Sequence, residues 1–350
     1  MPDNSRISGV LLGTAVGDAL GLPMEGMTPS AIRHRWPTID RYSLFGKTGF
    51  SSDDTEQTAL VAQALARHPG DLDLAVRAFR RSMLGWFLRL PWGIGLGTLR
   101  ACLRMAFGFE NTGVASAGNG AAMRAAVLGV RFREDATERR RWADAFARVT
   151  HRDARAVEGA RFVAELGALA STTTAHADRE KLALSALTVV DHRELRAAIE
   201  RGISLASSTN SDASAAIALG TTGFVVHSVS LATFFFVRHG TDATLAIVET
   251  IRAGGDTDTN AAIVGAWCGA LHGEAGLPSG LVERLQDGPF GRSHLRALAR
   301  ALEATRLGAH AEVPRFSWMA AFVRNVLLFP IVLVHALRVA LSWTTSRDGS

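Results

Sequence analysis

Helix-forming residues dominate the long segments of this chain, and this pattern restricts its fold more than any other feature. Alanine, leucine and arginine recur through these segments, whereas strand signals are weak. Segment 223–238 is rich in β-branched and aromatic residues, but it is longer than a typical strand and lacks clean alternation, so we expect a buried helix. The chain shows no repeat of solenoid period and no glycine-rich βαβ pattern. We therefore expect an all-α fold, with helices at 7–20, 56–67, 71–89, 136–149, 153–170, 179–189, 192–205, 223–238, 241–252 and 259–272.

The composition is that of a packed globular protein. Of 350 residues, 47% are hydrophobic, and 38 basic against 33 acidic residues give a net charge of +5. This charge is modest for the length and gives no reason to expect nucleic acid as a partner. The basic run 139–141 lies among acidic residues and suits a solvated helix face. Cys102 and Cys268 form neither a disulfide framework nor a metal motif, so we expect a reducing, cytoplasmic setting.

The apolar stretch near the N-terminus resembles a secretory signal in its hydrophobicity. Asp18 interrupts it, and the apolar region of a signal would not carry that charge. We expect residues 7–20 to form a buried first helix whose small residues allow close packing.

A change of composition near 306–316 separates a working domain, 1–312, from a strongly apolar segment, 313–350. The longest uncharged run, 325–337, has 13 residues. This is fewer than the ~20 that a membrane-spanning helix needs. A polar stripe, tryptophans at both ends and an excess of arginine favour a membrane surface or a hydrophobic partner groove for 315–343. Packing on the protein's own core and a true span are the alternatives. The stripe consists of Arg324, His335, Arg338 and Ser342; the tryptophans are Trp318 and Trp343, and Pro330 is an expected kink.

Paired carboxylates and hydroxyls lead into the apolar, small-residue segment that ends at residue 273. Asp256, Thr257, Asp258 and Thr259 stand at its start. One of them would suffice to cap a helix, and a second carboxylate adds repulsion that a cation would relieve. A calcium loop of the EF-hand type is excluded, because such a loop needs glycine at its sixth position and glutamate at its twelfth, and this chain has neither there. Helix capping and half of a metal site remain as the two interpretations.

A second cluster of the same design lies at 49–65. Ser51 and Ser52 precede Asp53 and Asp54, and a helical pattern follows. If the two helix starts converge, they form a site made only of oxygen ligands, which selects Mg²⁺, Mn²⁺ or Ca²⁺. Its ligands would suffice for two ions that share bridging carboxylates.

Five motifs in this order resemble the ADP-ribosylglycohydrolase family, whose members include the dinitrogenase reductase-activating glycohydrolases. Besides the two acidic clusters, they are GVLLGTAVGDALGLPMEGM at 9–27, GNGAAMRAAVLGV at 118–130 and THRDARAVEGA at 150–160. The resemblance covers roughly 8–275. It implies a compact orthogonal helical bundle with two Mg²⁺ or Mn²⁺ ions in a cleft. It also implies hydrolysis of the bond between C1″ of ADP-ribose and an acceptor such as arginine, serine or a small O-linked group.

The resemblance also implies a role for each matching residue. Glu25 and Asp54 would transfer protons, with no ground to choose between them. The metal ligands would be Ser52, Asp53, Asp54, Asp256, Asp258 and Thr259. The substrate-binding residues would be Gly95 and Gly97 in a glycine loop against phosphate, Ser116, Gly118 and Asn119 along ribose and diphosphate, and His151 near ADP-ribose. Ala117 stands where some relatives carry an aromatic residue that stacks on adenine, so adenine would be held less firmly or from elsewhere.

Two other functions fit the same pattern. The chain could be a non-catalytic member that binds ADP-ribose or a nucleotide, although it retains all six ligand positions. It could also be a manganese-dependent phosphoesterase acting on nucleotides. For the hydrolase we expect an ADP-ribosylated protein or a small ADP-ribose conjugate as partner, and a location in the cytoplasm or peripheral at the inner face of the membrane.

Overall fold

A computed structural model describes residues 5–345 of the protein, with side chains described for 6–334. This part of the chain forms helices and isolated β-bridges but no β-strand, which confirms the all-α prediction. The α-helices are α1 (Ser5–Gly21), α2 (Pro29–Arg35), α3 (Asp53–Arg67), α4 (Leu72–Phe87), α5 (Leu96–Ala106), α6 (Ala126–Arg131), α7 (Ala136–Arg148), α8 (Ala154–Ser171), α9 (Arg179–Ala186), α10 (Arg193–Ala206), α11 (Asp212–Leu219), α12 (Val225–His239), α13 (Ala243–Arg252), α14 (Thr257–His272), α15 (Ser279–Val282), α16 (Arg292–Arg306) and α17 (Trp318–Thr345). The 3-10 helices are η1 (Leu22–Met24), η2 (Asn119–Ala121), η3 (Leu187–Val189) and η4 (Glu274–Gly276).

Each of the ten predicted segments is helical in the structure, with small differences at the ends. The most important difference is at α3, which begins at Asp53 rather than at residue 56, so that the acidic pair lies in its first turn. The prediction omitted α2, α5, α6, α11, α15 and α16. Most of these are short, but α16 is a long amphipathic helix whose buried leucines at 295, 298 and 302 repeat every three or four residues.

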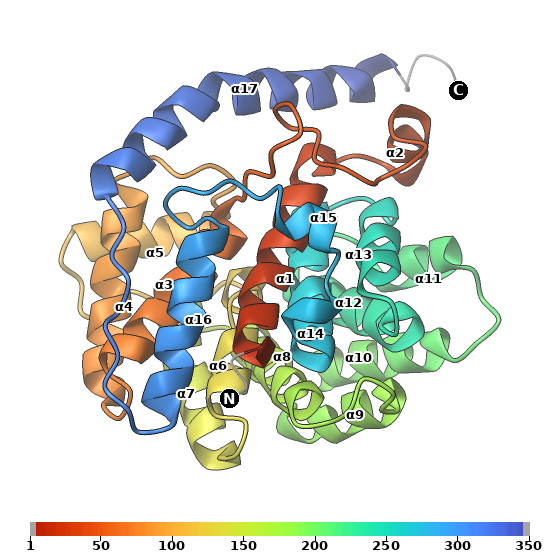
Figure 1. The fold of residues 1–350 in the computed structure, drawn as a ribbon. Coiled ribbons are helices and arrows are strands. Elements are labelled where there is room, and N and C mark those ends of the chain that lie inside the picture. Colours follow the sequence, from red (N-terminus) through yellow and green to blue (C-terminus); the bar gives the residue numbers. More distant parts are fainter. Residues whose placement is uncertain (1–4, 346–350) are drawn as a thin grey trace.

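The helices α1 and α14 form an antiparallel pair at the centre of the molecule (Figure 1). Glycines at every fourth position of α1 allow the two backbones to approach closely. A Cβ atom added at Gly13 would lie 2.1 Å from the carbonyl oxygen of Gly265. The facing pairs are Gly9 with Gly269, Gly13 with Gly265, Gly17 with Ala261, and Gly21 with Thr257. The end of α1 therefore lies beside the start of α14, where the acidic residues are.

The central pair is covered by other helices, which makes α1 a core helix. On length and hydropathy, Arg6–Met24 could cross a membrane, and among the described residues it is the one segment that could. Its apolar window is 100% buried inside the protein, as in the core helix of a globular protein. The expected first helix with small packing residues is thus observed.

The last helix, α17, lies across the end of the molecule at which α1 ends (Figure 1). Arg324 does not face outward as part of an exposed polar stripe. It pairs with the buried Glu56 of α3, which also binds Arg89, and Asn325 donates to the backbone oxygen of Arg89 at 3.0 Å. Trp318 donates its indole N–H to the backbone oxygen of Gly85. These contacts agree with the alternative in which this part of the helix packs on the protein's own core.

The other predicted stripe residues and Trp343 have side chains outside the described set. Apolar side chains at 319, 323, 327 and 329 remain exposed on α17. Pro330 lies inside the continuous helix Trp318–Thr345. Membrane or partner contact through 315–343 stays a prediction, and the fold adds no support for a membrane.

Candidate active site

Two helices begin at the same place in the structure, and their first turns carry the predicted acidic residues. Ser52 precedes α3 and Asp256 precedes α14, yet neither side chain accepts a capping hydrogen bond from its helix. Thr259 Oγ1 lies 3.2 Å from Asp54 Oδ2, and Ser52 Oγ lies 3.4 Å from the same oxygen. Capping therefore does not explain the clusters. All six predicted ligand residues meet here, and all are buried except Asp256, which is partly open to a pocket.

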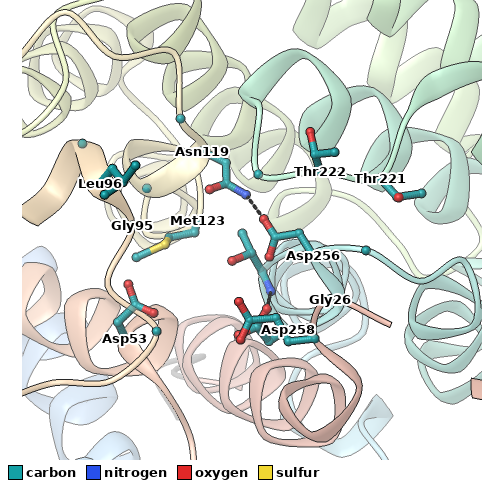
Figure 2. Close-up of a pocket in the computed structure, with 18 of the residues that line it drawn as sticks. Gly26, Asp53, Gly95, Leu96, Asn119, Met123, Thr221, Thr222, Asp256 and Asp258 are labelled. Atoms are coloured by element: carbon teal, nitrogen blue, oxygen red, sulfur yellow. Dashed lines mark hydrogen bonds between the residues drawn. The ribbon is translucent and has the colours of Figure 1, made fainter. Parts of the chain in front are cut away.

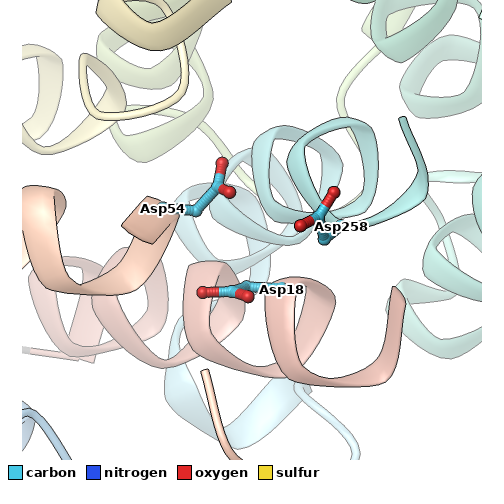
Figure 3. Close-up of side chains that lie close together, drawn as sticks. All are labelled: Asp18, Asp54 and Asp258. Atoms are coloured by element: carbon cyan, nitrogen blue, oxygen red, sulfur yellow. The ribbon is translucent and has the colours of Figure 1, made fainter. Parts of the chain in front are cut away.

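A further acidic residue, Asp18 of α1, joins these six residues as the seventh member of the cluster. Its oxygens accept the backbone N–H groups of Ser52, at 2.9 and 3.0 Å, and of Thr55, at 3.0 Å, together with the Thr55 hydroxyl. Oxygens of Asp18, Asp54 and Asp258 lie within 4.8 Å of one another (Figure 3). Asp18 thus fixes the start of α3 while adding a negative charge. The sequence signal for it was a lone carboxylate inside an apolar helix, which the sequence analysis used against a secretory signal but did not assign to the site.

Within the described part of the chain, the carboxyl groups of the cluster have no basic side chain as a salt-bridge partner. Burial first, and then repulsion by neighbouring carboxylates, raises the pKa of Asp53, Asp54 and Asp258 well above the ordinary value. Burial also raises the pKa of Asp18 and Asp256, and their hydrogen bonds oppose that shift. Among the described residues no basic side chain forms a salt bridge with any of them, and Asp54 Oδ1 is buried without a hydrogen-bond partner. A buried cluster of carboxylates of this kind is stable only when some of its carboxyl groups are protonated or when a cation is bound to them.

Of these residues, Asp53, Asp256, Asp258 and Thr259 form the floor of a pocket of about 690 Å³. Figure 2 shows Gly95 and Leu96 on one side of the acidic floor and Thr221 and Thr222 on the other. The lining residues include no phenylalanine, tyrosine or tryptophan, in keeping with Ala117 at the position before Gly118. Leu96, which is 69% exposed, is the large apolar side chain at that end.

The two glycines predicted to form a loop lie at the start of α5 instead. Gly95 is its N-cap, and a Cβ atom there would meet nothing within 4 Å. Gly97 is inside the first turn, where a Cβ atom would come within 2.6 Å of Ser116 Oγ and 2.8 Å of His151 Nε2. A glycine at 97 therefore keeps this end of the pocket open. A helix start also offers free backbone N–H groups to an anion, which the loop interpretation did not foresee.

A chain of buried hydrogen bonds connects the acidic floor to His151. Gln57 donates to Asp53 at 3.0 Å, and Arg124 donates to Gln57 at 2.7 Å and to Thr150 Oγ1 at 2.6 Å. Thr150 Oγ1 is 2.8 Å from His151 Nδ1. Arg124 can only donate, so among the described residues His151 Nδ1 is the one hydrogen-bond partner that can accept the Thr150 hydroxyl proton. We therefore assign that proton to Nδ1, which leaves the histidine proton on Nε2.

His151 therefore presents an N–H donor to the pocket, beside Gly97 and Gly118. Burial, and then the nearby Arg124, lowers the pKa of His151 to about 3. The ring is neutral at physiological pH and suits a hydrogen bond to an acceptor oxygen rather than proton transfer.

Two further predicted residues border the acidic floor. The amide of Asn119 donates to Asp256 Oδ2 at 2.6 Å and to Ser228 Oγ at 2.9 Å, so in this structure it orients a carboxylate. Glu25 follows η1 at the exposed rim of the pocket. Loss of hydration, and then repulsion by Asp256 and Asp18, raises its pKa to about 7.

Comparison with known proteins agrees with this architecture. The family model described as ADP-ribosylglycohydrolase matches residues 1–311. The chain belongs to the ADP-ribosylglycohydrolase family. It is 31% identical over 291 residues to an uncharacterized protein of Archaeoglobus fulgidus, covering 80% of this chain and 91% of that protein. It is 28% identical over 295 residues to the ADP-ribosyl-[dinitrogen reductase] glycohydrolase of Rhodospirillum rubrum, covering 81% and 90% of the two chains.

Solved structures give the same family. A chain described as an ADP-ribosylglycohydrolase-related protein complex superimposes with a TM-score of 0.68 at 26% identity, covering 87% of this chain and 99% of that one. The family match ends just before α17, which is the helix that binds Glu56. Membership in this glycohydrolase family supports hydrolysis of a glycosidic bond in an ADP-ribosylated substrate.

Proposed function

We propose that the protein is a metal-dependent hydrolase that cleaves the C1″ glycosidic bond of ADP-ribose attached to a protein side chain or a small acceptor. The observation that carries this proposal is a buried group of carboxylates at an open pocket, in a chain of this family, with no salt-bridge partner among the residues that the structure describes. ADP-ribose and the free acceptor are the products. The expected cytoplasmic location belongs to this proposal, and nucleic acid is not an expected partner.

The residues present fit two hard divalent cations. The donor set consists only of carboxylate and hydroxyl oxygens, which favours Mg²⁺ or Mn²⁺ over zinc. Ser52, Asp53 and Asp54 would hold them from α3, and Asp256, Asp258 and Thr259 from α14. Bound ions of this kind polarise substrate hydroxyls and make water a better nucleophile. Asp18 would act behind the ligands by fixing the start of α3.

The other lining residues would bind and orient the diphosphate and the distal ribose. The backbone at the start of α5 and the Nε2–H group of His151 supply donors for phosphate oxygens. Gln57, Arg124 and Thr150 hold that histidine in place through buried hydrogen bonds. A sugar held at both ends presents C1″ in a fixed orientation, which lowers the entropic cost of attack.

We assign proton transfer at the leaving group to Glu25 rather than to Asp54. Glu25 lies at the open rim, where an acceptor would leave, and the hydrogen bond from Gly26 N to Gly255 O, at 2.7 Å, holds its segment against the loop before Asp256. Asp54 is buried between two hydroxyl groups and does not line the pocket, which suits a ligand rather than a proton donor to the acceptor. A carboxyl that donates a proton near neutral pH needs a raised pKa, and the pKa of Glu25 is shifted in that direction.

The test offers arginine-, serine- and O-acetyl-linked ADP-ribose to the purified protein with Mg²⁺ or Mn²⁺ and identifies the products. Release of ADP-ribose from at least one conjugate supports the proposal and names the acceptor. Release of AMP would instead establish a phosphoesterase. Binding without any product would establish a non-catalytic member of the family.

A further inference from the structure

A second cavity, of about 710 Å³, opens beside the pocket. It lies among α2, α11, α12 and α13, which are neighbours on one side of the molecule (Figure 1). Pro29, Thr221 and Thr222 line both cavities, so the second begins where the first ends. Its size is within the range of sites that hold ligands.

The wall that the two cavities share, formed by Pro29, Thr221 and Thr222, is called the common wall. It lies at the side of the pocket from which an acceptor would leave. In the proposed orientation the phosphates occupy the end near Leu96 and His151, and Thr221 and Thr222 lie across the acidic floor from that end (Figure 2). The phosphate is joined to the distal ribose through C5″, next to C4″, and the acceptor is joined at C1″, on the other side of the ring oxygen. A ribose held over the floor therefore points its acceptor toward the common wall.

The second cavity offers an apolar surface and one unpaired charge. Ile217 lies at its mouth with 85% of its surface exposed, and the buried Phe235 lies against its inner side. Arg252 pairs with Glu249, and Asp212 pairs with Arg238 and His239. Arg33, in the last turn of α2, is exposed and forms no ion pair or hydrogen bond with any described residue.

We propose that this second cavity binds the acceptor polypeptide of an ADP-ribosylated protein, next to the modified residue. Ile217 would contact an apolar side chain of that polypeptide, and Arg33 would attract an acidic one. This inference rests on the proposed function and extends it, because it assigns a protein rather than a free small conjugate as the preferred substrate.

The experiment compares one linkage in two contexts. The linkage is the one that the wild-type protein hydrolyses, offered on the free amino acid and within a ten-residue peptide that carries leucine and glutamate beside the modified residue. We expect Arg33→Glu and Ile217→Asp each to lower kcat/KM for the peptide by about tenfold. Hydrolysis of the free conjugate should stay within about twofold of wild type, because neither residue lines the pocket over the acidic floor.

Two variants of the same chemistry serve as controls. Arg193→Glu, at the start of α10, and Leu184→Asp, on α9, change exposed residues outside both cavities. They should leave both substrates unaffected. Equal losses on the peptide in controls and test variants, or no loss in the test variants, would overturn the inference while the proposed function stands. A wild-type protein that hydrolyses neither conjugate would refute the proposed function, and this inference with it.

Discussion

The substitution Gly13→Ala tests whether the close contact of α1 and α14 builds the site. The added methyl carbon would lie 2.1 Å from the carbonyl oxygen of Gly265, whereas ordinary contact begins at 3.4 Å. The carbonyl oxygen is a backbone atom, and the backbone fixes the position of the added methyl carbon. No side chain can therefore rotate away, and the helices must separate. Overpacking of this kind costs about 1–3 kcal/mol and sometimes more, and the better helix propensity of alanine returns about 1 kcal/mol. Because the clash at 2.1 Å is with backbone, the upper end of that cost applies, and we expect a net loss of about 2 kcal/mol of unfolding free energy.

Thermal unfolding measures this loss. A drop of roughly 3 °C in Tm is expected, because an unfolding entropy of about 2.1 cal/mol/K per residue amounts to about 0.7 kcal/mol/K for a chain of 350 residues. Gly85→Ala is the matched control, because Gly85 also lies inside a helix but an added Cβ atom would meet only Trp318 Nε1, at 3.9 Å. The control should be as stable as wild type or slightly more stable. If Gly13→Ala melts at the same temperature as Gly85→Ala, the close contact does not have the energetic role assigned to it.

Three further predictions follow from the site and from α17. Asp53→Asn and Asp258→Asn should each lower turnover by more than about a hundredfold. The metal-free variants should melt at or above the temperature of the metal-free wild type, because a buried like charge is removed. Near-normal activity in both variants would contradict the metal assignment. Nitrogen-15 NMR of His151 should show a neutral ring with its proton on Nε2 from neutral pH down to about pH 4, since its pKa is lowered to about 3. A ring that titrates near pH 6.5, the ordinary value, would refute the hydrogen-bond assignment. Arg324→Ala should lower the unfolding free energy by about 3 kcal/mol, because the buried carboxylate of Glu56 keeps one cationic partner instead of two. Truncation after residue 312 should lower it by at least as much. Unchanged melting temperatures of both proteins would show that α17 contributes nothing to the fold.

The features that could be predicted from the sequence are those encoded by neighbouring residues. Helix propensity and apolar spacing are local, so the long helices could be predicted. The acidic half-sites could be recognised because each consists of consecutive residues, Ser52 to Asp54 and Asp256 to Thr259. Their convergence could be proposed only from a resemblance. The structure brings Asp54 and Thr259 together over a separation of 205 residues.

The remaining features depend on contacts between distant segments. Asp18 belongs to the cluster only because glycines bring α1 against α14, and a single carboxylate in an apolar helix does not reveal its neighbours. The link from Gln57 through Arg124 to Thr150 joins three separate segments of the chain. Arg324 was assigned to a polar stripe that favours a membrane surface or a partner groove. Helical periodicity gives the residues that share a face, but not which face meets the protein.

The central claim is that the cluster of buried carboxylates acts through bound divalent ions. The most direct test titrates metal-stripped protein with Mn²⁺ and measures ADP-ribose release from the conjugate that the wild-type protein accepts. The account predicts no release without metal and full activity once two ions are bound per chain. Full activity in the stripped protein, with no increase on adding Mn²⁺, would contradict it.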